Sequence, residues 1–312
     1  MNKQSLFLRN KLLVICGPTA TGKTRLALYL AKVFNGEIIS ADSRQVYQGM
    51  DIGTGKEWGQ GVKIWGYDLV APTQEFSVAH YAKIAREIIK DIWQRQKLPI
   101  LVGGTGLYLE AVTAGFETLD VGRNQELRAT LKNKSAHELF TILGHLDARK
   151  ARSLNFSDKQ NPRRLIRAIE VAQTRKVSKE KKPFKADILW IGLKAPRALL
   201  QKRIAERVEK RLEQGFEKEV EKLLEEGVSW QSQAMTSLGY RQWRDFLEGR
   251  ETKKEAMLKW QKEEEKYAKR QMTWFRRNKK IKWFDISLGE KLKENVEKTV
   301  EKWYPSKDAE KN

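Results

Sequence analysis

The stretch LLVICGPTATGKTRLALYLAKV, residues 12–33, determines the fold of this protein. Its apolar start predicts a buried strand, and Leu26, Leu30 and Val33 recur at the spacing of a helix. Between them, the segment matches G-x-x-x-x-G-K-[ST], a loop whose backbone N–H groups surround phosphate oxygens at a helix N-terminus. A glycine turn that only joined a strand to a helix would not need Lys23 and Thr24 together. The predicted phosphate-binding residues are Gly17, Pro18, Thr19, Ala20, Thr21, Gly22, Lys23 and Thr24.

Beyond this stretch, strand patterns alternate with helix patterns. We expect strands at 37–40, 99–102 and 188–193, a helix at 78–96, and one long amphipathic helix at 197–226. Such alternation is typical of a parallel sheet covered by helices. The sequence therefore predicts an α/β fold, a P-loop NTPase-like parallel sheet flanked by helices.

The middle of the chain has a different pattern. From residue 122 to 182 there is no strand candidate, only polar helical stretches such as 124–132 and 161–174. This predicts an all-helical domain inserted into the α/β core. The expected division is a first core part at 1–121, a helical insertion at 122–186, and a second core part with a basic helical C-terminal region at 187–312.

The chain is strongly basic. Its 312 residues include 61 Lys and Arg against 40 Asp and Glu, a formal net charge of +21. Polyanions such as nucleic acids are the usual partners of such an excess. The stretch 163–182 carries eight basic and two acidic residues, and 266–282 carries eight basic and no acidic ones, with aromatic residues among them. Basic and aromatic side chains together suit nucleotide contact, although a helix packing its aromatic face on the core would have the same pattern.

The composition also excludes several classes of protein. A single cysteine, Cys16, allows neither an intrachain disulfide nor a Cys-based zinc site. No apolar run reaches the roughly 18–20 residues that span a bilayer, and no secretory cleavage pattern begins the chain. We therefore expect a cytoplasmic protein.

Two further segments follow expected strands and carry chemical groups. Asp42 comes directly after the second strand, at the edge of the sheet where ligands usually bind in α/β folds. Its carboxylate could hold Mg²⁺ through water or act as a general base; the alternative is an aspartate that caps a turn. The cluster Gly103–Tyr108 would bring backbone amides and the Thr105 hydroxyl to the same edge, or form an ordinary turn into a helix.

Together, these segments resemble the tRNA dimethylallyltransferases, also called tRNA isopentenyltransferases, of the bacterial type. The similar blocks follow the family's order along the chain: 17–24, 38–54, 101–108, 161–170, 238–240 and 267–275. The resemblance implies transfer of a dimethylallyl group from dimethylallyl diphosphate to N6 of the adenosine next to the anticodon, position 37 of tRNA. The phosphate loop would then bind a diphosphate and not ATP.

The resemblance also implies roles for residues of the site. Asp42 matches the general base, and Lys23, with Mg²⁺ held partly through water by Thr24, would stabilise the diphosphate. Arg207 matches the family's catalytic arginine, with Arg203 as the weaker candidate one helical turn away. Thr19 matches a position that meets the diphosphate. The cofactor implied is Mg²⁺.

The same resemblance implies that the target adenine is flipped out of the anticodon stack into the protein. We expect a monomer that binds the tRNA anticodon arm. For Arg128, a solvated helix face is an equally good interpretation. The matching tRNA-contacting residues are Asp42, Ser43, Arg44, Gln45, Thr105, Arg128, Gln160, Asn161, Pro162, Arg163 and Arg164.

Two departures and three alternatives remain at this point. Where the family commonly reads Ala-Lys-Pro, this chain has Gly55-Lys56-Glu57, and where the family has a His-His segment it has Trp65-Gly66-Tyr67-Asp68. The alternatives are a P-loop kinase or other NTPase, an isopentenyltransferase acting on free adenine nucleotides, and an RNA-binding module with an inactive phosphate loop.

Overall fold

The chain folds around one parallel β-sheet. The computed structural model describes residues 10–59, 61–115, 118, 121–174 and 184–305. Six strands pair in the order β3-β2-β4-β1-β5-β6, and every pairing is parallel. This confirms the predicted α/β fold. The strands are β1 (Lys11–Cys16), β2 (Gly36–Ser40), β3 (Ile64–Trp65), β4 (Leu98–Gly103), β5 (Asp187–Lys194) and β6 (Ile281–Asp285).

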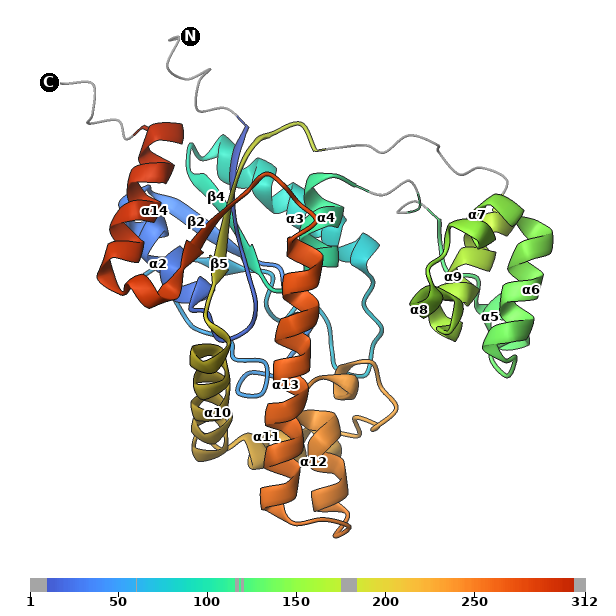
Figure 1. Cartoon of the computed structure of the whole chain (residues 1–312). Coiled ribbons are helices and arrows are strands. Elements are labelled where there is room, and N and C mark those ends of the chain that lie inside the picture. The colour runs from blue at the N-terminus through green and yellow to red at the C-terminus, as the bar shows by residue number, and fades with distance from the viewer. Residues whose placement is uncertain (1–9, 60, 116–117, 119–120, 175–183, 306–312) are drawn as a thin grey trace, which may run out of the picture. The chain divides into compact units, whose positions relative to one another are not determined.

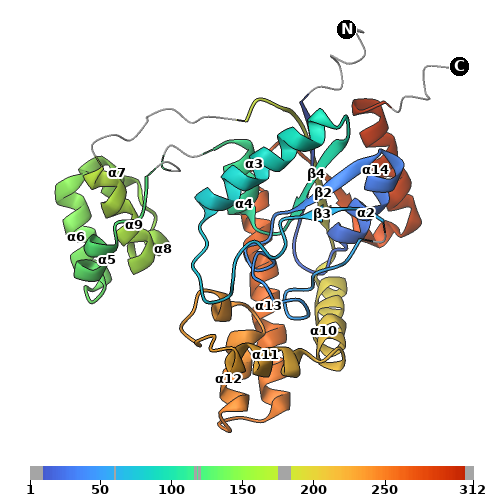
Figure 2. The same ribbon diagram turned by 180° about the vertical axis from the view of Figure 1, so that it is seen from behind.

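Helices cover both faces of this sheet (Figures 1 and 2). Helices α2 (Lys23–Val33) and α14 (Glu290–Trp303) pack on one face, where Leu13 and Ile15 of β1 meet Leu30 and Val296. Helices α3 (Val78–Gln94) and α4 (Gly106–Thr113) lie on the other face. Because side chains alternate along a strand, the central strands are buried on both faces and need the continuous apolar runs seen in the sequence.

A helical layer follows the carboxyl ends of the strands (Figure 1). It contains α10 (Arg197–Glu213), α11 (Phe216–Glu225), α12 (Tyr240–Leu247) and the start of α13 (Lys253–Phe275), with a short 3₁₀ turn at Ala234–Thr236. Another short 3₁₀ turn, Ile286–Leu288, joins β6 to α14. Phe216, Trp243 and Trp260 pack ring against ring at the centre of the helical layer. This aromatic cluster packs α11, α12 and α13 against one another, beyond the edge of the sheet where ligands bind in α/β folds.

Three features of this unit differ from the predictions. The expected helix at 197–226 is two helices, because Gly215 adopts φ 95° and turns the chain between α10 and α11. The two edge strands, β3 and β6, were not predicted. β3 has only two residues, and β6 carries charged residues within five, so neither shows the apolar run of a central strand.

A separate helical unit spans Ala114–Pro183, while the core unit comprises Met1–Thr113 with Phe184–Asn312. The predicted insertion at 122–186 lies mostly within this helical unit. It has a core of its own, in which Leu139, Leu143, Leu165 and Ile169 are fully buried. Its helices are α5 (Gln125–Leu131), α6 (Ala136–Leu146), α7 (Ala148–Ser153), α8 (Phe156–Lys159) and α9 (Pro162–Gln173). In the described part of the chain, no helix is both long and apolar enough to span a membrane.

Candidate active site

A cleft of about 430 Å³ lies at the carboxyl ends of the central strands. Its walls come from the phosphate loop, the loops that follow β2 and β4, and helices α10 and α13. The side chains that carry chemistry in its lining are Thr19, Lys23, Thr24, Asp42, Gln45, Arg203, Arg207, Tyr267 and Gln271. The structure therefore brings the predicted phosphate loop, Asp42 and the predicted arginine into one site.

The phosphate loop packs closely against β5 and is stabilised by hydrogen bonds within the loop. Gly17 has φ 141°, and a Cβ there would lie 2.4 Å from the carbonyl oxygen of Leu193, so only glycine fits. The Thr21 hydroxyl and the Lys23 ammonium donate to the Pro18 carbonyl at 2.8 and 2.6 Å. Burial, helped by the nearby Arg207 cation, lowers the pKa of Lys23 to about 8. A bound anionic ligand would therefore stabilise the charged form of Lys23.

Arg207 contacts the phosphate loop directly. Its Nη1 donates to the Thr19 hydroxyl at 2.8 Å, across 188 residues of sequence. Arg203, one turn earlier on α10, also lines the cleft. The contact with Thr19 distinguishes Arg207 as the arginine that is already in place beside the loop.

Gln271 of α13 joins the phosphate loop to the glycine loop after β4. Its Oε1 accepts from the Thr19 backbone N–H at 2.8 Å, and its Nε2 donates to the Gly104 carbonyl at 2.9 Å. A Cβ at Gly104 would lie 2.1 Å from this amide nitrogen, so a side chain there would displace the Gln271 amide from this position. The sequence reasoning gave Gln271 no role, although it lies within the family-like block at 267–275.

Asp42 is half-buried and lines the same cleft. Its Oδ1 accepts from the Arg44 backbone N–H at 2.8 Å, so the carboxylate does cap the following turn. The Ser43 N–H donates to the Thr105 hydroxyl at 3.3 Å, which joins the two loops, while the cluster Gly103–Tyr108 also forms the turn into α4. The turn uses one carboxylate oxygen, and the capping role is therefore compatible with a second role as a base.

Two of the predicted tRNA-contacting residues are engaged within the core unit. The Arg44 guanidinium donates to the Gln233 carbonyl at 2.7 Å. Gln45 is buried; its Oε1 accepts from Ser40 at 2.6 Å, and its Nε2 donates to the Gly55 carbonyl at 3.0 Å. Gln45 thereby ties the loop after β2 to the segment around Gly55.

The two segments that depart from the family pattern lie next to each other in the structure. Lys56, whose side chain is fully buried, donates to Asp51 at 2.6 Å, Asp68 at 2.5 Å and the Tyr47 carbonyl at 2.9 Å. All three ammonium hydrogens are therefore used. Next to it, the ring of Trp58 packs edge-on against Tyr67, which lines the cleft. The segments 55–58 and 65–68 are therefore in direct contact in this chain.

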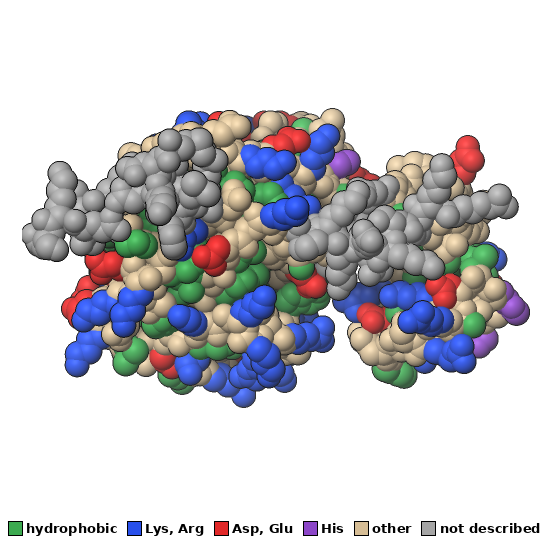
Figure 3. Space-filling model, turned by 90° about the horizontal axis from the view of Figure 1, so that it is seen from above, with side chains coloured by type: hydrophobic (Ala, Val, Ile, Leu, Met, Phe, Trp, Pro, Cys, Tyr) green, Lys and Arg blue, Asp and Glu red, His purple; other side chains and the backbone are tan. Residues whose placement is uncertain are grey.

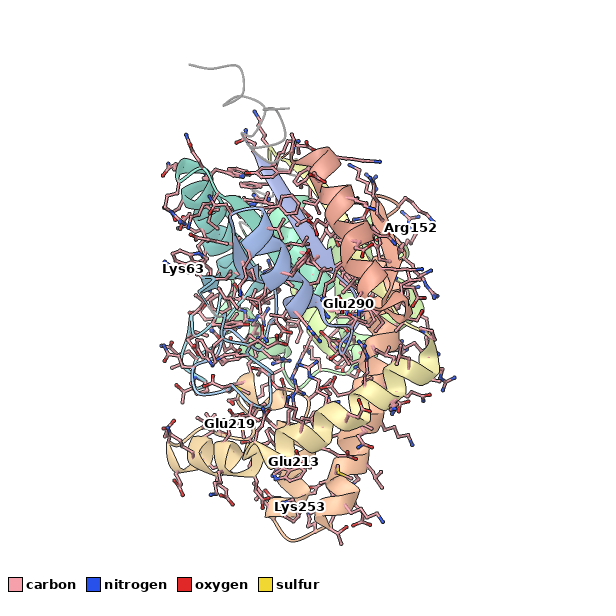
Figure 4. All side chains as sticks on the ribbon, turned by 90° about the vertical axis from the view of Figure 1, so that its left-hand side faces the viewer. Lys63, Arg152, Glu213, Glu219, Lys253 and Glu290 are labelled. Carbon is pink, nitrogen blue, oxygen red and sulfur yellow. The ribbon has the colours of Figure 1, made fainter. Side chains whose placement is uncertain are left out.

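Glu219 of α11 is a structural residue that the sequence reasoning missed. Its carboxylate accepts the backbone N–H groups of Asp51, Ile52 and Gly53 at 2.7–2.9 Å, and also the Tyr240 hydroxyl. Figure 4 labels Glu219 between α11 and the loops above it. One carboxylate thus fixes the turn that leads to Lys56.

A second hollow, of about 570 Å³, lies at the turn between α12 and α13. Its charged lining is internally paired: Arg250 binds Asp245, and Lys259 binds Glu251. The Arg250–Asp245 pair is exposed and contributes little to stability, whereas the Glu251 side chain is only 7% exposed and its Oε1 has no hydrogen-bond partner among the described residues.

Magnesium is the cofactor that the residues of the cleft would suit. Thr24 lines the cleft with Asp42, and both supply the oxygen ligands that Mg²⁺ prefers. Mg²⁺ commonly binds one or two protein oxygens and completes its shell with water and phosphate oxygens. Among the described residues, no group of three or more His, Cys, Asp or Glu side chains is placed to hold a metal ion. A magnesium ion that is bound mainly through phosphate oxygens and water does not need such a group.

In the helical unit, the residues 160–164 lie at the start of α9. Asn161 caps this helix by accepting from the Arg164 N–H at 3.2 Å, and Pro162 occupies its first turn. Arg163 is exposed, and the Arg164 guanidinium pairs with Asp158 at 2.5 Å. Cationic side chains are thus presented at one helix N-terminus.

Arg128 of α5 has a structural partner. Its Nε and Nη2 bind the two oxygens of Glu170 at 2.6 and 2.8 Å, and only 1% of the Glu170 side chain is exposed. Burial opposes ionisation of Glu170, but the Arg128 hydrogen bonds help to lower the pKa of that carboxyl. This two-pronged ion pair was not predicted, because the partners lie 42 residues apart.

We expect Arg128→Met to destabilise the protein by about 2–3 kcal/mol, because Glu170 would keep a buried charge without its main partner. Urea unfolding of the full chain measures this loss. Arg164→Met is the matched variant: it breaks an exposed pair and should cost less than about 1 kcal/mol. Unchanged unfolding of Arg128→Met, together with a clear loss of tRNA affinity, would instead assign Arg128 to the tRNA surface.

The basic surface agrees with the composition. In the view of Figure 3, Lys and Arg side chains gather along one edge of the core unit, with few acidic side chains among them. Within the basic stretch at 266–282, Lys269, Arg270, Arg276 and Lys279 are exposed, whereas Phe275 is buried. The stretch therefore does both things that the sequence allowed: it packs an aromatic residue on the core and exposes cations. Lys181 and Lys182 lie outside the described residues.

Comparison with known proteins gives consistent matches. The family model described as "IPP transferase" matches residues 45–278, and the "Isopentenyl transferase" model matches residues 10–64. A tRNA dimethylallyltransferase of Carboxydothermus hydrogenoformans is 42% identical over 94% of this chain and 96% of that protein. One from Anoxybacillus flavithermus is 39% identical over 89% of this chain and 91% of its own length.

Solved structures match as well. The tRNA isopentenylpyrophosphate transferase of Bacillus halodurans has a TM-score of 0.72 and 35% identity, covering 95% of this chain and 97% of that one. A eukaryotic dimethylallyltransferase acting on tRNA shares the fold with a TM-score of 0.81, at 24% identity and 93% coverage of this chain. Family models, full-length relatives and a shared fold agree, and the chain therefore belongs to the tRNA dimethylallyltransferase family.

Proposed function

We propose that the protein transfers a dimethylallyl group from dimethylallyl diphosphate to N6 of the adenosine next to the anticodon of tRNA. The observation that carries this proposal is the meeting of the phosphate loop and Asp42 in one cleft, in a chain of this family. A diphosphate bound by the loop and an amine beside Asp42 would then face each other. Binding two reactants in this way removes much of the entropic barrier to their reaction.

The donor's diphosphate is assigned to the loop Gly17–Thr24. Lys23 and Arg207 would neutralise the charge that grows on the leaving oxygen as the carbon–oxygen bond breaks. Thr19 would place its hydroxyl at the same group, because it is already hydrogen-bonded to Arg207. When bound, Mg²⁺ would add positive charge at the diphosphate, held by the Thr24 hydroxyl and partly through water.

The acceptor amine is assigned to the side of Asp42. The electron pair of N6 forms the bond to C1 of the dimethylallyl group, the C1–oxygen pair leaves with the diphosphate, and the N6 proton goes to the Asp42 carboxylate. An aromatic amine is a weak nucleophile, so removing its proton as the new bond forms should lower the barrier. The carboxylate oxygen that does not cap the Arg44 turn is available for this role.

Recognition of the tRNA is assigned to both units. Asp42 and Gln45 line the cleft, and the Thr105 hydroxyl accepts from the Ser43 N–H between them; on the helical unit, Arg163 and Arg164 offer cations at the start of α9. Phosphate contacts of this kind give affinity that falls as salt concentration rises. The net charge of +21 supports this assignment.

The test is an assay with purified protein, magnesium, radiolabelled dimethylallyl diphosphate and unmodified tRNA. Label at the adenosine next to the anticodon is the expected result. Labelling of AMP in place of tRNA would assign the protein to free nucleotides. Turnover of ATP without any prenyl transfer would contradict the proposal and favour a kinase or other NTPase.

A further inference from the structure

A second arginine lies behind Arg207, away from the cleft. Arg211 follows one turn later on α10 and pairs with Glu264 of α13 at 3.2 Å; the two side chains are only 5% and 8% exposed. The indole N–H of Trp260 donates to the same Glu264 oxygen, and its ring lies against the Arg211 guanidinium. Among the described residues, the Arg211 Nε has no hydrogen-bond partner. Two charges are thus buried with one donor unused, an arrangement that adds little to stability.

The guanidinium groups of Arg207 and Arg211 both lie close to Gly55. This residue has φ 66°, and a Cβ there would lie 2.5 Å from Nη2 of Arg207 and 2.7 Å from Nη2 of Arg211. The two guanidinium groups therefore occupy the space that any side chain would fill. The left-handed conformation at Gly55 favours glycine in any surroundings, and a side chain there would also displace the ends of both arginines.

Glu264 connects this pair to the phosphate loop. Besides the hydrogen bond from Arg211, Glu264 accepts one from Thr19. The Thr19 hydroxyl in turn accepts a hydrogen bond from the Arg207 guanidinium. Burial opposes ionisation of Glu264, but the Arg211 and Arg207 cations lower the pKa of this carboxyl, so it is charged at neutral pH. Its negative charge offsets the repulsion between two adjacent arginines.

We propose that Arg211 and Glu264 form a positioning pair for the diphosphate site, which holds Arg207 between Thr19 and Gly55. This inference rests on the proposed function. Arg211 stands on the far side of Arg207 from the cleft and restricts where that side chain can move. Glu264 fixes Thr19 from the same side. The pair acts through Arg207 and Thr19 and does not itself touch the substrate.

The first test removes both charges at once, in the variant Arg211→Met/Glu264→Gln. Because a buried pair can be replaced by neutral groups with little loss of stability, we expect a urea midpoint close to that of the wild type. We expect kcat/KM for dimethylallyl diphosphate to fall about tenfold, since Arg207 is no longer held in place. The KM for tRNA should stay unchanged.

The matched control is Arg241→Met/Glu263→Gln. Arg241 and Glu263 also join two helices, α12 and α13, at 2.9 Å, and Glu263 directly precedes Glu264, but this pair is partly exposed. We expect its removal to leave the donor kinetics as in the wild type. Loss of donor kcat/KM in this control as well would show that any charge removed from α13 has the same effect, and would overturn the proposal.

A second test uses Gly55→Ala, alone and combined with Arg211→Met. The added methyl group meets both guanidinium groups, so the substitution should lower donor kcat/KM several-fold in the wild type and by less once Arg211 is gone. Equal losses in the two backgrounds would mean that Arg211 does not act at this contact, and would contradict the inference. So would wild-type donor kinetics in the Arg211→Met/Glu264→Gln variant.

Binding of inorganic diphosphate, followed by calorimetry, separates this inference from the proposed function. If the wild type binds diphosphate more tightly than Arg211→Met/Glu264→Gln but transfers no prenyl group, the positioning pair stands and the proposed reaction falls. If transfer occurs and both proteins bind diphosphate equally and react at equal rates, the reaction stands and the positioning pair falls.

Discussion

Asp42→Asn is expected to lower the rate of prenyl transfer by roughly 100-fold or more, the range of general-base contributions. Asparagine keeps a side-chain oxygen that can accept the Arg44 N–H, as Asp42 does at 2.8 Å, but it cannot take a proton from N6. The substitution therefore separates the two roles that the sequence left open for this aspartate. Single-turnover transfer to tRNA measures the loss, and tRNA affinity should change little.

Asp42→Ala completes this comparison, because alanine removes both the cap and the base. If capping were the whole function, Asp42→Asn would react like the wild type and only Asp42→Ala would be slow. We expect both variants to be slow, and Asp42→Ala alone to lose stability, by about 1 kcal/mol in urea unfolding. Wild-type turnover of Asp42→Asn would contradict the base assignment.

Lys23→Met is expected to lower kcat/KM for dimethylallyl diphosphate by about 100- to 1,000-fold, the cost of removing one donor to a developing oxyanion. In the wild type, the Lys23 cation is present below its pKa of about 8 and is lost above it. The KM for the donor should therefore rise as pH increases beyond 8. This pH dependence should be absent from Lys23→Met.

The free energy of unfolding should also depend on the ionisation of Lys23, and it should increase as the pH rises, whereas donor binding weakens. The unfolded chain holds the Lys23 proton up to the ordinary pKa of 10.5, whereas the folded protein releases it at about 8. Between these values the unfolded state binds more protons, so the free energy of unfolding rises with pH. Urea unfolding of the wild type, relative to Lys23→Met, should show this rise.

Lys32→Met is the control, because Lys32 lies exposed in the last turn of the same helix. It should change neither the donor kinetics nor their pH dependence. A donor KM in the wild type that stays constant from pH 7 to 10 would contradict the assignment of Lys23 to the diphosphate.

The local patterns of the sequence predicted the site's components. The phosphate loop, the strands at its flanks and the loop with Asp42 depend on neighbouring residues: apolar runs, glycines at turns and a helix start. Parallel strands bring their carboxyl ends to one edge, so the order of the elements indicated that Asp42 and the phosphate loop would lie at the same edge of the sheet. The choice between Arg207 and Arg203 came only from the resemblance.

The errors have equally local causes. The helix at 197–226 looked continuous because its apolar periodicity continues past Gly215, and periodicity does not report the left-handed conformation of one glycine. The sequence allowed Arg128 to be either a tRNA contact or part of a solvated helix face, and its ion pair was not predicted because its partner, Glu170, lies 42 residues away along the chain. Short edge strands such as β3 are too brief to carry a pattern.

The sequence by itself thus determined the α/β fold, the phosphate loop and the family, because these rest on contiguous motifs in a fixed order. The tertiary structure decided how the site is held together. Gln271 reaches the Thr19 backbone across 252 residues, and Arg211 meets Glu264 across 53. Such contacts depend on how α10 and α13 pack beyond the sheet, and no local propensity specifies that packing. The groups that touch substrate can therefore be predicted from motifs, whereas the residues that position them become visible only in the folded chain.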